Sequence, residues 1–206
     1  MSEFAQQLFE ARGRGTKRIV ALVNGMAASA AYWIASQADE IISIPSGMSG
    51  SIGVFTAHED LSVALEQNGV KMSLIYAGKH KVDGNPFEPL SDEHRAFMQG
   101  RVDEAYAQFV KDVARGRGVT PAEVRTGFGQ GRALTAKDAK AAGLVDRVAT
   151  VDETLARLSG RKIAASGGAR ADGGAVDELH AHESSEVVDA LTDINEEDRA
   201  RRIRLA

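Results

Sequence analysis

The sequence predicts an α/β fold, because apolar runs rich in β-branched residues alternate with segments of helical periodicity from residue 3 to residue 76. This order is typical of crossover units that build a layered sheet. Further helices follow up to residue 158, and beyond Ala165 the chain becomes Gly-rich and then charged, with few aromatic residues. We therefore expect one domain over residues 1–160 and a flexible linker with a charged, partly helical tail over residues 161–206.

The elements follow from local patterns in chain order. Residues 3–12 carry an i, i+4 apolar face, residues 18–23 are a continuous apolar run, and Pro45 stops the next short strand. Residues 47–53 are rich in Gly and Ser and predict a loop, whereas residues 70–76 alternate like a strand. The expected helices are residues 3–12, 30–38, 61–67, 91–115, 135–142 and 151–158, with a short one from Pro121, and the expected strands are residues 18–23, 39–44, 70–76 and 144–148.

Two features of the middle of the chain indicate function or assembly. Residues 77–90 form a long connection with two glycines and two prolines, and loops of this length are often functional. The helix over residues 91–115 carries an apolar stripe, which favours a core or oligomer contact over a cofactor site. The stripe consists of Met98, Val102, Tyr106, Phe109 and Val113.

The composition excludes several classes of function. The chain has 206 residues, a net charge of −4 and no cysteine, so disulfides, thiolate catalysis and cysteine-ligated metals are excluded, and nothing favours binding to nucleic acid. No apolar run approaches the roughly 20 residues that span a bilayer, and no secretory signal precedes the first strand. We expect no metal, no cofactor and no membrane anchor, and a location in the cytoplasm.

A turn of small residues after the first strand holds the candidate nucleophile. The segment Asn24–Trp33 joins that strand to a helix and places a single hydroxyl, that of Ser29, near the helix start. Backbone N–H groups and the helix dipole favour negative charge there, as a nucleophile with an oxyanion intermediate requires. The alternative is that Ser29 only caps the helix.

A nucleophilic serine needs a base, and no Ser-His-Asp signature surrounds Ser29. Lys79 and Lys81 lie in the long connection after residue 76. A lysine serves as a base only when its pKa falls from about 10.4 toward 7 or 8. The alternative for either lysine is a solvated surface charge, and the residues alone do not separate the two lysines.

Ordered motifs in the chain resemble a known family. The runs Met26–Tyr32, Gly50–Val54 and Gly78–Lys81, followed by Arg117-Gly118, Gly131–Ala139 and Gly143–Asp146, are similar to the signal peptide peptidase A family of serine peptidases. This family is a Ser-Lys branch of the ClpP/crotonase superfamily, and the similarity spans about residues 4–158. The stretch His80–Phe87 resembles the phage branch, the prohead or head-maturation proteases.

The resemblance implies a role for each matching residue. Ser29 would be the nucleophile and Lys81 the general base, Ser51 would orient the lysine, and the backbone N–H of Ala30 would donate to the oxyanion. The implied fold is the repeated β-β-α superhelix of the ClpP/crotonase superfamily. Members begin with further strands and a Gly-rich turn that this sequence does not show, so we expect the first strands to be lacking.

The resemblance also implies a function and partners. It indicates a serine endopeptidase of the head-maturation type that forms a homo-oligomer, cleaves protein substrates in the host cytoplasm or the assembling prohead, and contacts capsid, portal or scaffold proteins. One alternative is an impaired fragment that serves as an assembly component through the 91–115 helix and the charged tail. Another is an acyl-CoA hydratase or isomerase of the crotonase branch, although no pair of carboxylates lies at the Ser29 turn.

Overall fold

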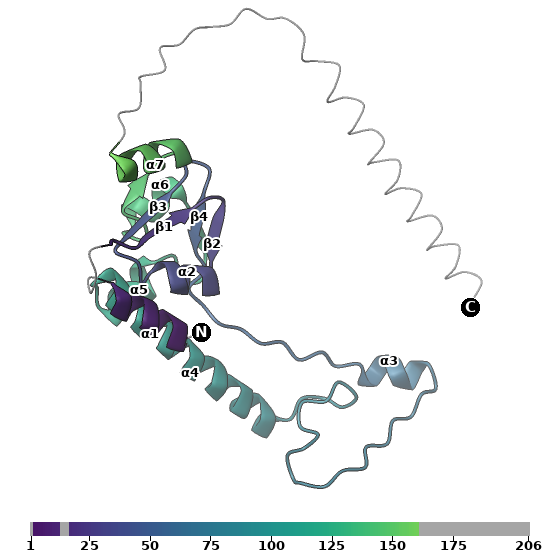
Figure 1. The fold of residues 1–206 in the computed structure, drawn as a ribbon. Coiled ribbons are helices and arrows are strands. Elements are labelled where there is room, and N and C mark those ends of the chain that lie inside the picture. Colours follow the sequence, from purple (N-terminus) through teal and green to yellow (C-terminus); the bar gives the residue numbers. More distant parts are fainter. Residues whose placement is uncertain (1, 13–16, 161–206) are drawn as a thin grey trace, which may run out of the picture. The chain divides into compact units, whose positions relative to one another are not determined.

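The computed structural model describes residues 2–12 and 17–160 (Figure 1). The predicted linker and tail, residues 161–206, lie outside the described residues. The alternation of helices and strands confirms an α/β fold. The helices are α1 (Ser2–Ala11), α2 (Ala30–Ala35), α3 (Ser62–Gln67), α4 (Asp92–Arg117), α5 (Pro121–Gly127), α6 (Ala136–Ala141) and α7 (Val151–Ser159). The strands are β1 (Val20–Val23), β2 (Met26–Ala28), β3 (Glu40–Ser43), β4 (Met48–Gly50), β5 (Ala133–Thr135) and β6 (Arg147–Val148).

The described strands form two three-stranded sheets. In the first, β3 lies between β1 and β6 and all three strands are parallel; in the second, β4 pairs in parallel with β2 and antiparallel with β5. Two residues separate β1 from β2 and four separate β3 from β4, so the chain passes twice from the first sheet into the second. The order is therefore β-β-α twice in succession, with α2 and then α3 as the helix.

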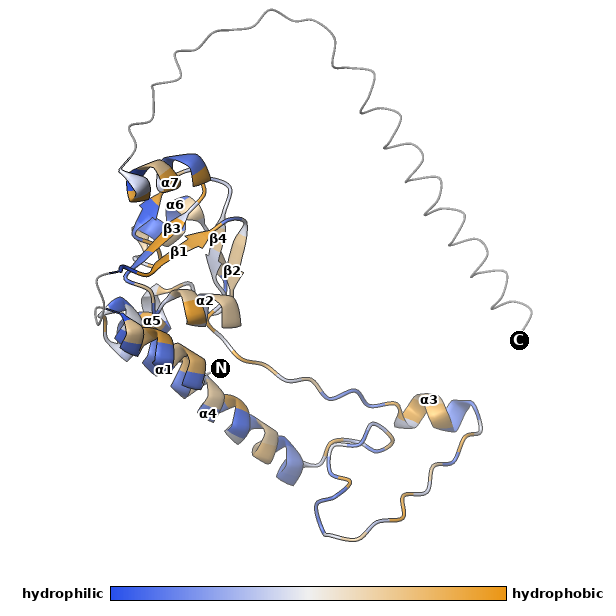
Figure 2. Ribbon diagram, viewed as in Figure 1, coloured by the Kyte–Doolittle hydropathy of each residue, from blue (hydrophilic) through white to orange (hydrophobic). Residues whose placement is uncertain are grey.

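The core gathers where β1 and β3 meet the C-terminal half of α4. Both strands are among the most hydrophobic elements of the chain (Figure 2), and Ile41 and Ile42 of β3 are fully buried. Phe109 and Val113 of α4 pack in the same cluster. Burial of such side chains stabilises the fold by about 1.5–3 kcal/mol each.

The long helix α4 is framed by capping signals and touches α2 near its end. The Ser91 hydroxyl accepts a hydrogen bond from the His94 N–H at 3.2 Å, and Gly118 ends the helix in a left-handed conformation. At Gly116 a methyl group would overlap the carbonyl oxygen of Ser36, so only glycine permits this approach. Of the predicted stripe, the C-terminal members are buried, whereas Met98, Val102 and Tyr106 are only partly buried.

The structure corrects three sequence-based predictions. The predicted loop over residues 47–53 contains strand β4, and strands β2 and β5 were not predicted; β2 and β4 consist largely of small residues that lack a strand signature. The predicted strand over residues 70–76 has no regular secondary structure. Its alternating side chains find no neighbouring strand within the described residues, and an unpaired strand is not stable on its own.

Candidate active site

Ser29 and Ser51 occupy equivalent positions on two neighbouring strands. Strands β2 and β4 run in parallel with Ala28 opposite Gly50, so the next residue on each strand is a serine. The Ser29 N–H donates to the Gly50 carbonyl at 2.8 Å, and the Ser51 N–H donates to the Arg132 carbonyl at 2.9 Å. Both serines therefore lie at the same end of the second sheet, directly after the last residues of β2 and β4.

Ser29 has a backbone conformation that is unusual for a residue with a side chain. Its φ is 54° and its ψ is −122°, and Ser51 also has a positive φ of 53°. Such conformations cost about 1–3 kcal/mol each and cluster at active sites. The Ser29 hydroxyl makes no capping hydrogen bond to α2, so the capping interpretation is wrong. The strained turn instead leaves Ser29 exposed at the start of α2.

A cavity of about 650 Å³ surrounds the two serines. Its lining residues are apolar or small apart from the serines, and none of them carries a titratable group. They are Ser29, Ala30, Trp33, Ser51, Gly53, Val54, Phe55, Phe109 and Gly131. The backbone N–H of Ala30, the first residue of α2, has no acceptor within the helix. The cavity thus combines a hydroxyl with a backbone donor but contains no base.

The structure does not bring Lys81 to the two serines. Lys81 is exposed, does not line the cavity, and belongs to the connection between α3 and α4. That connection lies beyond the N-terminal end of α4, whereas α2 lies near the other end of that helix (Figure 1). The predicted residues therefore form two groups, with Ser29, Ala30 and Ser51 in one and Lys81 in the other.

The two candidate lysines differ in their contacts. The Lys79 ammonium pairs with Glu93 of α4 at 3.2 Å. The Lys81 side chain makes no ion pair or hydrogen bond within residues 2–12 and 17–160, and its backbone N–H donates to the Gly78 carbonyl at 3.1 Å. The two lysines of this turn thus differ in whether the ammonium has a partner among the described residues.

The turn that holds Lys81 is fastened to the start of α4. Asp83 accepts a hydrogen bond from His80 at 2.8 Å and lies 3.6 Å from the Nδ1 atom of His94. The Glu93 contact of Lys79 adds a second link to the same helix end. These contacts place the turn beside the start of α4.

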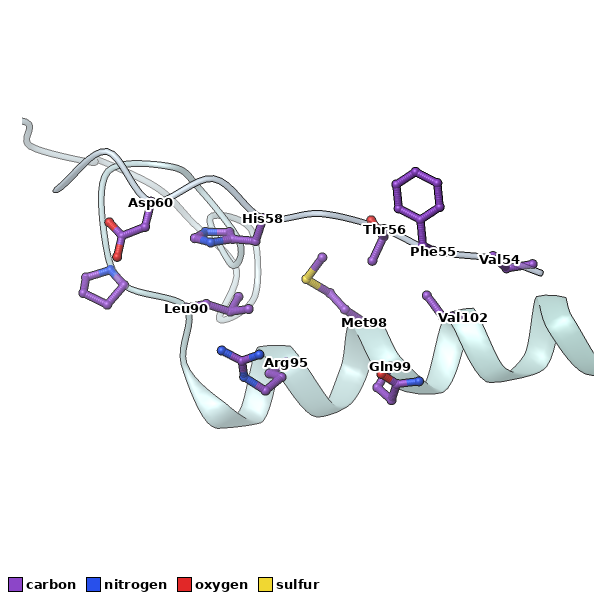
Figure 3. A pocket seen from close by; sticks show the side chains of 11 residues that line it. Val54, Phe55, Thr56, His58, Asp60, Leu90, Arg95, Met98, Gln99 and Val102 are labelled. Atoms are coloured by element: carbon purple, nitrogen blue, oxygen red, sulfur yellow. The ribbon is translucent and has the colours of Figure 1, made fainter. Parts of the chain in front are cut away.

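A second cavity continues from the first along the extended segment after Ile52. It has a volume of about 630 Å³ and shares Val54 and Phe55 with the cavity at Ser29. Figure 3 shows Met98 and Val102 of α4 pointing toward this segment, while Phe55 points away from the helix. The segment is thus not packed as in a protein core, and Phe55 is 89% exposed.

A polar cluster that runs from the buried Tyr32 to the exposed Asp146 lies on another side of α2. The Tyr32 hydroxyl donates to the Leu144 carbonyl at 2.8 Å, and burial raises the pKa of Tyr32. Partial burial acts to raise the pKa of Asp146, but hydrogen bonds from Arg117 and from the Ile41 N–H prevail and lower it. None of these residues lines the cavity at Ser29, so the cluster serves the fold rather than the chemistry.

Sequence reasoning placed Ser51 only through the family resemblance, although an internal signal was present. The strings Gly25-Met-Ala-Ala-Ser29 and Gly47-Met-Ser-Gly-Ser51 share the pattern Gly-Met-x-x-Ser. The structure places both strings as adjacent parallel strands in register. This repeated pattern could have predicted strands β2 and β4 and the pairing of the two serines.

Comparison with known proteins identifies the family. Residues 11–164 match Peptidase family S49, and this match covers most of the chain. The chain belongs to peptidase family S49. Within the described residues, no helix is long and apolar enough to cross a membrane, and no three acidic or histidine side chains gather to hold a metal ion.

Several relatives of this S49 chain have names that state a proteolytic or phage role. Capsid assembly protease C of Escherichia phage lambda is 35% identical over 162 residues, covering 77% of this chain and 36% of that protein. Protease 4 of Salmonella typhi is 35% identical over 158 residues, or 74% of this chain and 24% of that protein. Head-tail preconnector protein GP5 of Enterobacteria phage P21 is 42% identical over 109 residues, or 53% of this chain and 22% of that protein. The matched region thus covers between 22% and 36% of the length of these relatives.

Proposed function

We propose that this S49 chain is a serine endopeptidase in which Ser29 is the nucleophile. The observation that carries the proposal is the exposed hydroxyl of Ser29 on a strained turn, inside a cavity and next to the N–H of Ala30, which as the first residue of α2 has no acceptor within the helix. The Oγ atom attacks a peptide carbonyl, the Ala30 N–H stabilises the resulting oxyanion, and water later hydrolyses the acyl-enzyme. Removing one such donor typically costs about 10²–10³ in rate.

The base in this proposal is Lys81 of a neighbouring copy of the chain. The Ser29 cavity contains no titratable group, and the turn of Lys81 is fastened to the far end of α4 by Asp83 and Glu93. A second copy can bring its own Lys81 turn to Ser29 without breaking these contacts. The amine then takes the Oγ proton and passes it to the leaving amine, and Ser51 accepts a hydrogen bond from the lysine and orients it.

The extended segment supplies a surface for such an assembly. No residue between Ile52 and Phe109 is buried in the single chain. Ile75 is 99% exposed, and Met72 and Tyr76 are also exposed. Exposed apolar patches of this kind mark interaction sites. Pairing of residues 70–76 with a second copy would give the predicted strand a partner.

The proposal also covers the fold type and the substrates. The successive β-β-α units, β1-β2-α2 and β3-β4-α3, support the superhelical repeat of the ClpP/crotonase type. The names of the phage relatives support capsid or scaffold precursors as substrates and the prohead or host cytoplasm as the place of cleavage.

Labelling with a fluorophosphonate probe tests the site. We expect the wild-type chain to be labelled and the Ser29→Ala and Lys81→Ala variants to lose labelling. Lys79→Ala is the matched control, because it removes a lysine from the same turn and should keep most of the labelling. Full labelling of the Ser29→Ala chain would contradict the proposed nucleophile, and equal loss in both lysine variants would contradict the choice of Lys81.

A second candidate function is an assembly component without catalysis. It is favoured by the absence of a base among the residues that line the Ser29 cavity, together with the apolar surface on the extended segment. Under this alternative, the wild-type chain self-associates but neither reacts with the probe nor cleaves a capsid precursor. Probe labelling that requires Ser29 would exclude it.

A further inference from the structure

The wall of the Ser29 cavity is formed by an aromatic pair. Trp33 of α2 stacks on Phe109 of α4, with ring centroids 4.5 Å apart and ring planes 9° from parallel. Both rings line the cavity. With Val54 and Phe55 they form an apolar surface beside the serine hydroxyl, and such a surface accepts an apolar side chain of a peptide.

A buried carboxylate holds one ring of this pair. The Trp33 indole N–H donates to the Oδ2 atom of Asp112 at 2.9 Å, and Asp112 is only 2% exposed. The indole has a single N–H donor, so this bond together with the stacking on Phe109 restricts the orientation of the ring. Since a charged acceptor makes a stronger hydrogen bond than a neutral one, the carboxylate constrains the ring more than an amide would.

Asp112 is itself fixed by neighbours on α1 and α4 and by a residue that follows α2. Its carboxylate accepts hydrogen bonds from Ser2 of α1 at 3.2 Å and from Gln108 of α4 at 3.1 Å, and it lies 3.5 Å from the Arg115 guanidinium. Its backbone carbonyl accepts a bond from Gln37 at 3.0 Å. Because α1, α2 and α4 all converge on this group, its position is set by the fold and not by the cavity.

We infer that Asp112 is a positioning residue that sets the substrate specificity of the Ser29 site through Trp33. By holding the indole against Phe109, Asp112 keeps the wall flat and the cavity open to an apolar side chain next to the scissile bond. The inference rests on the proposed function of Ser29. It assigns Asp112 no contact with the substrate and no part in proton transfer.

The chain offers a direct readout of this role, because Trp33 is its only tryptophan. In the Asp112→Asn and Asp112→Ala chains we expect the emission of Trp33 to shift to longer wavelength and its quenching by acrylamide to increase, with the larger change in the alanine variant. Glu40→Gln is the matched control: Glu40 is also a buried carboxylate paired with arginines, and neither Glu40 nor these arginines line the cavity. The Trp33 emission of the Glu40→Gln chain should equal that of the wild type.

Kinetics on two substrates separate positioning from loss of fold. For a peptide with a leucine before the scissile bond, Asp112→Asn should raise KM about tenfold and change kcat about twofold or less, as expected for an altered apolar pocket. For a peptide with glycine there, KM should stay within about twofold of the wild type. In a Trp33→Phe background, which lacks the donor, Asp112→Asn should have no further effect on KM.

Three results would overturn the inference: unchanged Trp33 emission in both Asp112 variants, equal losses on the leucine and glycine peptides, or an unchanged effect of Asp112→Asn in the Trp33→Phe background. Emission and quenching need no catalysis, so they are also measured on the Ser29→Ala chain. A Ser29→Ala chain that still cleaves would overturn the proposed function instead, and the optical comparison with Glu40→Gln would still decide how the ring is held.

Discussion

The residues around Ser29 and the residues around Lys81 belong to two regions that are built differently. The region from β1 to Ile52, together with the chain from Phe109 onward, contains the buried core cluster and fixes Ser29 and Ser51 through strand register and backbone hydrogen bonds. Residues 53–108 contain no buried residue and expose large apolar side chains. Ser29 thus lies in the region that contains the buried core, whereas Lys81 lies in a segment without a buried residue. In the proposed mechanism, catalysis therefore depends on assembly.

Substitution of Ile75 tests the difference between these two regions with the largest expected effect. The Ile75→Asp variant places a charge on a fully exposed apolar position, so we expect the free energy of unfolding to change by about 0.5 kcal/mol or less. Self-association should be lost, and peptidase activity should fall by at least about 10²-fold, the contribution of a general base. Analytical ultracentrifugation and a cleavage assay measure the two effects. An associating, active variant would contradict the role given to the extended segment.

Ile41 provides the matched isoleucine in the packed region. It is fully buried between β1 and the helices, so Ile41→Ala should lower the free energy of unfolding by about 2–5 kcal/mol. Chemical denaturation measures this loss, and Ile75→Ala serves as the control that should leave stability nearly unchanged. Equal losses in the two alanine variants would mean that residues 53–108 contribute to the folding of the single chain after all.

The contact between α2 and α4 predicts a smaller loss. Because a methyl group on Gly116 would overlap the Ser36 carbonyl, Gly116→Ala should destabilise the chain by about 1–3 kcal/mol. Gly100 lies on the exposed half of the same helix with open space around it, so Gly100→Ala should be neutral or stabilising by up to about 1 kcal/mol. Thermal unfolding of the two variants compares the packed and exposed halves of α4 directly.

The smallest effect concerns acid stability. The pKa of Asp146 is lowered in the folded chain, so the folded state binds fewer protons at this group than the unfolded state does. The stabilisation is present above a pH of about 4, near the ordinary pKa of an aspartate, and is lost as the pH falls through the lower folded pKa. Asp146→Asn should remove this part of the acid dependence, by about 1 kcal/mol or less because the pair with Arg117 is partly exposed. Unfolding followed from about pH 5 down to about pH 2, a range that spans the ordinary pKa and the region below it, measures this dependence.

The sequence was sufficient where local patterns and burial agree, and insufficient where structure depends on a neighbour. The long helix has a strong periodic signal and the buried strands β1 and β3 have β-branched apolar runs, and the sequence predicted all three elements. Strands β2 and β4 consist largely of small residues that lack a strand signature, so the sequence did not predict them. Residues 70–76 have a strand pattern but no partner strand in the described chain. The separation of Lys81 from Ser29 has no local signal, because it depends on how the turn is fastened to α4.

Mixing two inactive variants tests the central claim most directly. The Ser29→Ala chain keeps Lys81 and the Lys81→Ala chain keeps Ser29, so a mixed assembly can combine an intact serine with an intact lysine from a neighbouring copy. The account predicts that each variant alone is inactive and that their mixture regains fluorophosphonate labelling and peptide cleavage, with the label only on the Lys81→Ala chain. A mixture as inactive as its components, in a sample shown to contain mixed assemblies, would contradict a base supplied by a second copy.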